Sequence, residues 1–339
     1  MESLQQLFKL LDLTGFDAKV YVALLSLGPS SPSRLVEELS THRPQIHGSL
    51  KRLAARGLVE VYSGRPAMYR AVPPDVALGL IGDEYEELVE EARRFLDSME
   101  AKGREGVHGV WMYKSRRGLL SRFAKTIGEA ETDLVVCGDA IFLAKLMPLL
   151  RDAQERGVTV YTLVYEIPGV VFREEDFSGL RKVKKAVSGD LMAIADSKIG
   201  VIAQRRLGAD GFPEYGIVVE EPVLIDYLLQ DFLYRWRRSA AVRDEPLRLP
   251  ARLTMFKLAV IEAARLLGEG RGLWASARGR WVHRGAGGRV EGRVVKAGID
   301  DTTGIAQMVV ETGGGEVTIG GPDAILEDFA ASEVYLRGV

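Results

Sequence analysis

Side chains that can hydrogen-bond to base edges or phosphates gather between residues 43 and 70. Ile46, Leu50 and Leu53 recur at helical spacing after Pro44 and predict one buried helix face. The opposite face then carries amide and basic groups that suit adenine, guanine or phosphate, beside a glycine that allows close backbone approach. The predicted contacts are Arg43, Gln45, His47, Gly48, Lys51 and Arg52 on this helix, with Arg65 and Arg70 on a following hairpin.

A second group of polar residues surrounds a Gly-Gly pair near the C-terminus. We expect a strand over 316–319 to enter a turn at Gly320 and Gly321 and then a helix that carries Glu327 and Asp328. Turned backbone groups and a nearby carboxylate can bind hydroxyl groups, which both donate and accept hydrogen bonds. An acidic first turn is also ordinary helix capping, so the spacing alone favours that structural role.

Composition excludes several other kinds of site. The chain has 339 residues, a net charge of −2 and a single cysteine, Cys137, so neither an internal disulfide nor a Cys-cluster metal site is available. We expect no metal, no cofactor, no membrane span and no signal peptide, and hence a cytoplasmic protein. The chain contains no asparagine. This absence fits a thermophilic source, although a bias in genome composition would produce it too.

The elements that must position the first group occupy residues 1–73. The pattern predicts three helices followed by a strand–turn–strand, which together are typical of a winged helix-turn-helix. From Arg34 to Arg70 there are 7 basic residues and 3 acids, so any nucleic-acid site is a local basic patch. The alternative is a three-helix domain used for protein contacts.

A long acidic helix follows, within residues 74–105. Its apolar residues recur at heptad spacing, which predicts a coiled coil with a second copy of the same helix. The alternative is a single helix packed on its own domain. The heptad positions are Ile81, Tyr85, Leu88, Ala92, Phe95 and Met99.

The remainder of the chain predicts an α/β domain over 106–243 and a β-rich domain over 244–339. The strand 133–137, the helix after it and the strand near 158–160 look like half of a phospholipase-D-like domain. Those enzymes use an H-x-K-x4-D motif. Counting back from Asp196 places Leu191 at the lysine position and Gly189 at the histidine position, so the catalytic pair is missing.

The order of these four parts resembles the archaeal TrmB family of sugar-responsive transcription regulators, as does the run Ala-Arg-Gly-Leu-Val at 55–59 before the wing. The resemblance implies that Gly321 and Glu327, with Gly320 in the same turn, contact a sugar such as maltose or a related glucoside. The family also presents an asparagine fifteen residues before that glycine, where this chain has Ala306 followed by Gln307. Either Gln307 substitutes, or the ligand differs, or binding is lost.

The sequence therefore predicts a multi-domain α/β protein that acts as a homodimeric, non-enzymatic regulator of transcription. It would bind double-stranded promoter DNA, with an affinity modulated by a sugar or oligosaccharide. The alternative is a DNA-binding regulator or chromatin protein whose C-terminal half recruits a protein partner. A hydrolase built on the α/β domain is disfavoured by the missing catalytic pair. A further sugar contact is expected near 222–230, with Glu220, Glu221 and Asp226 as candidates.

Overall fold

The computed structural model describes residues 1–100, 109–187, 189–204, 213, 215–300 and 302–339. It divides the chain into two compact units, Met1–Gly106 and Val107–Val339. The end of the predicted coiled coil at 101–105 and the predicted start of the α/β domain at 106–108 lie outside the described residues. Among the helices that are described, none is both long enough and apolar enough to cross a membrane.

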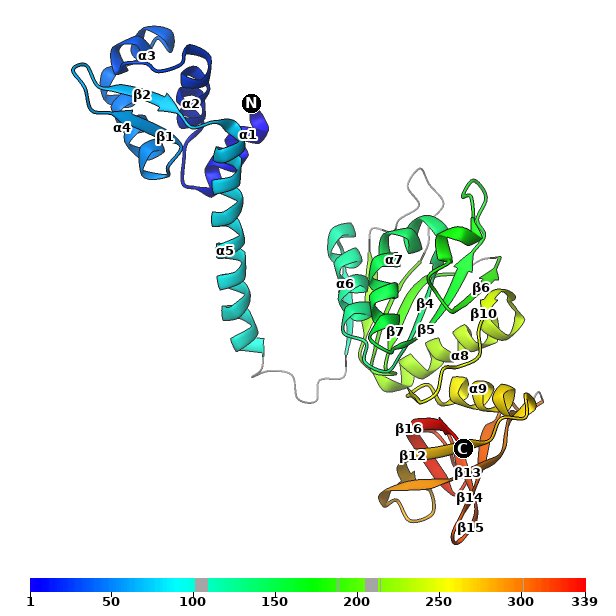
Figure 1. The fold of residues 1–339 in the computed structure, drawn as a ribbon. Coiled ribbons are helices and arrows are strands. Elements are labelled where there is room, and N and C mark those ends of the chain that lie inside the picture. The colour runs from blue at the N-terminus through cyan, green and yellow to red at the C-terminus, as the bar shows by residue number, and fades with distance from the viewer. Residues whose placement is uncertain (101–108, 188, 205–212, 214, 301) are drawn as a thin grey trace. The chain divides into compact units, whose positions relative to one another are not determined.

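The first unit is a group of short helices followed by a hairpin and one long helix (Figure 1). A capping box between Thr14 and Asp17 begins the second helix, and the Ser31 side chain caps the third. The sequence predicts three helices before the hairpin, but the amphipathic N-terminus forms one more, with Phe8 buried against Tyr21. The elements are α1 (Glu2–Leu10), α2 (Gly15–Leu27), α3 (Pro32–Glu38), α4 (Arg43–Ala55), β1 (Val59–Tyr62), β2 (Met68–Ala71) and α5 (Pro74–Glu100).

The long helix α5 is buried only at its start. Ala77 and Ile81 belong to the core of the first unit. Farther along, the large apolar side chains at the predicted heptad positions are at least half exposed, from 51% for Tyr85 to 60% for Met99. Apolar surface of this extent on an acidic helix calls for a partner.

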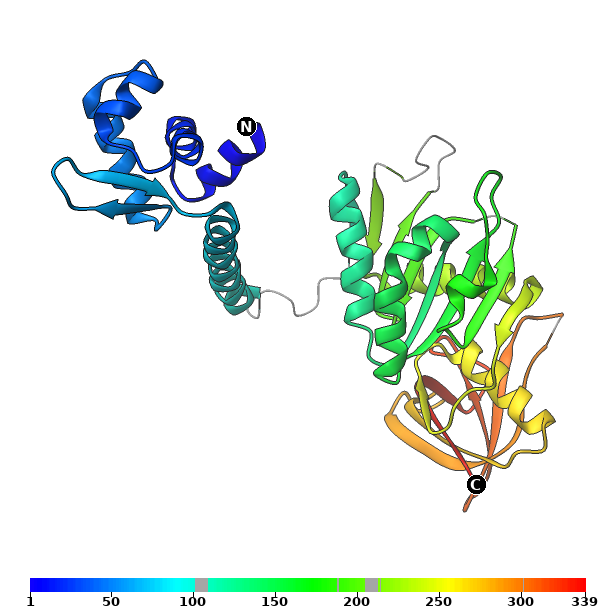
Figure 2. The same cartoon turned by 45° about the horizontal axis from the view of Figure 1, so that its top comes forward.

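The second unit begins with an eight-stranded mixed sheet in the order β10-β6-β5-β4-β7-β8-β9-β3. Its two faces are covered by different helices, because alternate residues of β4 and β5 enter two separate cores. Helices α6 and α7 cover one face, whereas α8 and the later helix α9 cover the other (Figures 1 and 2). The elements are β3 (Val110–Tyr113), α6 (Arg116–Gly128), β4 (Asp133–Asp139), α7 (Ala140–Glu155), β5 (Thr159–Tyr165), η1 (Glu174–Phe177), β6 (Lys182–Ala186), β7 (Leu191–Ala195), β8 (Ile199–Ala203), β9 (Gly216–Val219), α8 (Pro222–Arg238) and β10 (Ala240–Asp244).

A six-stranded sheet follows, in the order β11-β16-β12-β13-β14-β15. An additional parallel pairing joins β15 to β16, so the five strands β16, β12, β13, β14 and β15 form a closed ring. The predicted β-rich C-terminus is thus present. Its elements are β11 (Ala251–Leu253), α9 (Phe256–Gly268), β12 (Leu273–Trp281), β13 (Gly287–Ile299), β14 (Ala306–Thr312), β15 (Gly315–Gly320) and β16 (Phe329–Gly338).

The helix predicted after the Gly-Gly turn does not form, and that prediction is wrong. Residues 321–328 are turns and bends that lead directly into β16. The carboxylate of Asp328 accepts hydrogen bonds from the backbone N–H and the hydroxyl of Thr318, at 2.8 and 2.7 Å. Together with the pairing of Ile319 with Phe329, these bonds draw the segment into the sheet.

Helix α9 joins the two sheets of the second unit. One hydrophobic core contains Tyr161 of β5, Ala259 and Ala263 of α9, and Ala275 and Leu336 of the six-stranded sheet. The boundary predicted at 243/244 falls within β10, and the segments on its two sides share a core within one compact unit.

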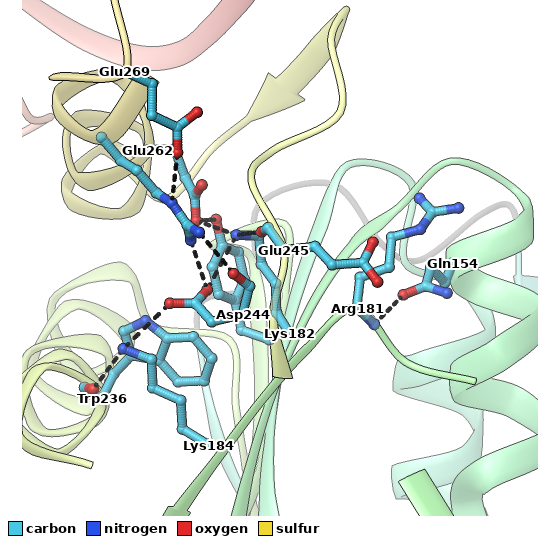
Figure 3. Close-up of polar contacts among 11 residues, drawn as sticks. Gln154, Arg181, Lys182, Lys184, Trp236, Asp244, Glu245, Glu262 and Glu269 are labelled. Atoms are coloured by element: carbon cyan, nitrogen blue, oxygen red, sulfur yellow. Dashed lines mark hydrogen bonds and ion pairs between the residues drawn. The ribbon is translucent and has the colours of Figure 1, made fainter. Parts of the chain in front are cut away.

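A buried charge network also ties α9 to the edge of the first sheet (Figure 3). Lys182 Nζ lies 2.6 Å from Glu262 Oε1, and both side chains are 4% exposed. The hydroxyl of Tyr161 donates to the same carboxylate oxygen at 3.2 Å, and Arg265 pairs with Asp244 at 3.2 Å. Breaking such a buried pair leaves an uncompensated charge and costs about 3–5 kcal/mol, so the network fixes the placement of α9.

Candidate functional site

The exposed face of α4 carries the predicted nucleic-acid contacts. Ile46, Leu50 and Leu53 are buried, as predicted from their spacing. Gln45, His47 and Lys51 are exposed along the opposite side, together with Arg43. Two neighbours that the sequence did not single out hold these side chains: the Thr41 hydroxyl donates to Gln45 Oε1 at 2.6 Å, and Arg43 Nη2 donates to Ser33 Oγ at 3.2 Å.

Arg52 has a partner within the fold, Asp17, that the sequence pattern does not predict. Its Nη2 and Nε groups donate to the two carboxylate oxygens of Asp17 at 2.7 and 3.1 Å, and the Asp17 side chain is fully buried. Burial alone would raise the pKa of Asp17, but hydrogen bonds from Arg52 and Thr14 lower it below its usual value. Arg52 therefore ties α4 to α2, and its Nη1 group and the second N–H of Nη2 have no acceptor among the described residues and remain for a phosphate.

The two hairpin arginines differ from each other in whether they have a partner within the fold. Arg70 lies opposite Glu60 in the register of β1 and β2, and its Nε donates to that carboxylate at 2.6 Å. Arg65 is exposed in the turn and has no hydrogen-bond or ion-pair partner among the described residues. Of the two, Arg65 is the cation available to an incoming anion.

The predicted hydroxyl-binding turn brings Gly320, Gly321 and Glu327 together. A Cβ atom added to Gly320 would lie 2.7 Å from Glu327 Cδ and 2.6 Å from Ala324 Cβ, so the carboxyl group is packed directly over this glycine. Glu327 is 5% exposed, yet its carboxylate has no hydrogen-bond or ion-pair partner in the part of the chain that the structure describes. A carboxylate in this position can accept hydrogen bonds from solvent or from the hydroxyl groups of a ligand.

Ala306 and Gln307 lie beside the same turn. The register of β14 and β15 pairs Met308 with Ile319. This is the last pair of that register, so Gln307 and Ala306 lie one and two residues beyond it in β14, on the side where β15 runs into the turn. Ala306 is buried, whereas Gln307 is partly exposed, so Gln307 is the side chain that can offer an amide at this point.

Asp133 positions the turn from the other sheet. Its carboxylate accepts hydrogen bonds from the backbone N–H groups of Thr254 and Met255, at 2.9 and 2.8 Å, just before α9 begins. The next residue, Phe256, contacts the turn: its ring would lie 3.6 Å from a Cβ on Gly321. The buried carboxylate thus holds the start of α9 against the Gly-Gly turn.

The positions of the missing catalytic motif have structural roles. A Cβ atom at Gly189 would lie 2.2 Å from Tyr165 Cζ, so the tyrosine ring occupies that space. Leu191 is fully buried. Asp196 accepts three backbone N–H groups, from Glu131, Thr132 and Asp133.

Two of the three acids considered near α8 also have local partners. Glu220 accepts hydrogen bonds from Trp111 Nε1 at 3.0 Å and Arg122 Nη2 at 3.3 Å. The Glu221 side chain caps α8. Asp226 is exposed, and within the described parts of the chain its partner is Gln230, which donates to it over a long 3.4 Å.

Three family models match the chain. They are "Sugar-specific transcriptional regulator TrmB" over residues 8–75, the N-terminal subdomain of the TrmB EBD over 109–243, and the TrmB/TrmBL1 EBD C-terminal subdomain over 248–339. The chain belongs to the TrmB family of transcriptional regulators. The last two matches coincide with the two subdomains that α9 joins.

Individual proteins of this family share low sequence identity with the chain. The chain is 28% identical over 172 residues to the HTH-type sugar sensing transcriptional regulator TrmBL1 of Pyrococcus furiosus, covering 49% of each chain. It is 23% identical over 183 residues to the DNA-binding HTH-type transcriptional repressor TrmBL2 of Thermococcus kodakarensis, covering 48% of this chain and 66% of that protein. These alignments thus span about half to two thirds of the length of the two relatives.

Solved structures give low similarity scores. TrmBL2, an archaeal chromatin protein, has a TM-score of 0.39 at 19% identity, over 70% of this chain and 98% of that one. Nuc from Salmonella typhimurium, a phospholipase D family member, has a TM-score of 0.32 at 17% identity, over 41% of this chain and 100% of that one.

The Asp133 contact in this TrmB-family chain predicts a pH dependence of stability. Burial raises the pKa of Asp133 to about 6, against the partly offsetting hydrogen bonds from Thr254 and Met255. Between about pH 4 and 6 the folded chain therefore holds a proton that the unfolded chain releases. The contribution of this group to stability rises as pH falls through 6 and is lost as pH rises.

Comparison with Asp133→Asn isolates this effect, because the amide does not titrate. The difference in free energy of unfolding should shift in favour of the wild type by about 2 kcal/mol from pH 7 to pH 4. Denaturant unfolding followed by circular dichroism measures it, with Glu316→Gln on β15 as the exposed control. A pH-independent difference would show that Asp133 titrates as an ordinary carboxyl group.

Proposed function

We propose that this chain is a DNA-binding transcription regulator whose affinity for DNA responds to a sugar or oligosaccharide. The first unit would act as a winged helix-turn-helix, with α4 as the recognition helix and the β1–β2 hairpin as the wing. The observation that carries the proposal is the exposed polar face of α4, held by its own buried face and by the Arg52–Asp17 pair.

Two kinds of contact are expected on this face. The amide of Gln45 can pair with a base edge in the major groove, and the Thr41 hydroxyl limits its rotation. Lys51 and Arg65 are exposed cations suited to phosphates, which position a protein on DNA without reading sequence. Arg52 is assigned to the fold and contributes to DNA binding through the orientation of α4.

Substitutions on α4 should separate these roles. Gln45→Ala should weaken binding to a duplex selected from a random library by about tenfold and leave a scrambled duplex unaffected, because one base contact is lost. Lys51→Ala should weaken both duplexes and lower the salt slope by about one. Fluorescence anisotropy measures both, with Arg93→Ala on α5 as the control. Unchanged affinities in both variants would remove α4 from the DNA interface.

We further propose that α5 forms a coiled coil with a second copy. Leu88, Phe95 and Met99 are 52–60% exposed and share the heptad stripe. A dimer would place two recognition helices on two half-sites of a roughly palindromic element.

Charges placed in the stripe should dissociate this dimer. The double variant Leu88→Glu/Phe95→Glu should halve the mass measured by light scattering, toward the 37.3 kDa of one chain, because four carboxylates would face each other. The matched control, Glu87→Gln/Arg94→Gln, alters neighbouring positions outside the stripe. If the first variant keeps the wild-type mass, another surface holds the copies together, and if the wild type already has the mass of one chain, there is no dimer.

For the effector we propose the turn at 320–327. Supporting it are the unpartnered Glu327 carboxylate, the close glycines and the place of Gln307 beside the turn. A sugar hydroxyl would donate to Glu327 and accept from Gln307. By linkage, a sugar that changes DNA affinity has its own affinity changed by DNA to the same extent.

Calorimetry with maltose, maltotriose, sucrose, trehalose and glucose tests the turn. At least one should bind the wild type, and Glu327→Gln should weaken it about tenfold or more, because a hydrogen bond to a charged group is lost. Gly320→Ala should do the same by displacing Glu327. The control is Glu316→Gln, an exposed carboxylate of β15.

Absence of heat from every sugar would favour the second candidate, a regulator whose C-terminal half recruits a protein. One observation favours it: Ile325 and Leu326, beside Glu327, are 78% and 76% exposed. Adjacent apolar side chains presented in this way suit a protein surface.

A further inference from the structure

A hollow of about 220 Å³ lies on the six-stranded sheet, and its lining includes no residue of the 320–327 turn. Four strands contribute to it. Alternate residues of these strands, such as Ala275, Ala277 and Val334, enter the core with α9, so the residues between them point to the opposite face of the sheet. We name this hollow the arginine groove, and its lining residues are Arg252, Ser276, Arg278, Arg289, Glu333 and Tyr335.

The strand register makes the arginine groove unusual. Arg278 lies directly opposite Arg289 on β13 and opposite Glu333 on β16. Like charges directly opposite on neighbouring strands are destabilising. A β-bulge follows immediately, where the register of β12 and β16 shifts between Arg278 and Gly279. Bulges re-aim the adjacent side chain, and this one affects Arg278.

The cations of the groove are not neutralised evenly. Arg289 Nε is 2.6 Å from Ser276 Oγ and 2.5 Å from Glu291 Oε1. By contrast, the side chains of Arg252 and Arg278 are exposed and have no hydrogen-bond or ion-pair partner among the residues that the structure describes. Two guanidinium groups at one hollow are thus left without an anion.

We propose that the arginine groove binds the phosphate group of a small hydroxylated phosphate ester. Guanidinium groups bind phosphate oxygens in bidentate fashion, and two of them suit a single phosphate. The Tyr335 hydroxyl and the Glu333 carboxylate can bond to the hydroxyl groups of the same molecule. Glu291 and Glu333 flank the arginines and confine the positive charge to one short stretch. The groove therefore fits one phosphate better than the continuous backbone of a nucleic acid.

This site is separate from the proposed sugar site. None of the residues lining the groove belongs to the 320–327 turn. The two proposals are therefore tested by variants of different residues, and either can fail while the other stands.

Calorimetry on the full chain at low salt, with inorganic phosphate and glucose 6-phosphate as probes, tests the groove. Both probes should bind, glucose 6-phosphate more tightly. Arg252→Ala and Arg278→Ala should each weaken binding about tenfold or more. Arg278→Lys should also weaken it, because an ammonium group lacks the planar fork. The control Arg284→Ala removes an exposed arginine outside the groove, and Glu327→Gln tests the sugar turn; neither should alter phosphate binding.

Two outcomes would overturn the proposal. One is that neither probe binds the wild type; if Arg252→Ala and Arg278→Ala then also lose affinity for duplex DNA, the groove is a nucleic-acid contact. The other is that these variants, shown by circular dichroism to be folded, bind both probes as well as the wild type.

Discussion

The burial of α9 between two sheets is the constraint on which the second unit depends. A helix enclosed in this way can slide or rotate only by disturbing both surfaces. Two polar contacts oppose such movement: Asp133 holds the backbone at its start, and Lys182 holds Glu262 in its middle. Because Phe256 follows the first of these contacts and touches the Gly-Gly turn, the geometry of the turn is set from the distant strand β4.

In the first unit, too, a buried carboxylate fixes the position of a helix. The buried Asp17 carboxylate accepts a hydrogen bond from Arg52 of α4. It also accepts one from the backbone N–H of Thr14, in the capping box that begins α2. One carboxylate thus sets both the start of α2 and its angle to α4. The polar face of α4 is presented outward because the other side of the helix is anchored in this way, which places Arg52 in the scaffold and leaves its neighbours to contact a ligand.

Local patterns predicted most of the elements. Helical spacing located α4 and α5, and the hairpin at 59–71 followed from a strand–turn–strand pattern. The failures came from contacts distant in sequence. The helix expected at 322–329 gave way to the pairing of β15 with β16 and the Thr318–Asp328 bonds. The pairing of Arg52 with Asp17 could not be predicted either, because the two residues are 35 positions apart; a DNA contact by Arg52 stays a prediction. The DNA, dimer and sugar contacts stay predictions.

The shared core around α9 also bears on how such proteins can change over time. Sequence comparison divides the second unit into two matches that meet between 243 and 248, as if they were exchangeable modules. Yet α9 packs side chains against both halves. Its Glu262 and Arg265 form ion pairs with Lys182 of β6 and Asp244 of β10. A recombinant chain that joined one half to the corresponding half of another protein would have mismatched side chains along the whole of α9. The halves are therefore expected to diversify together, through paired substitutions across α9.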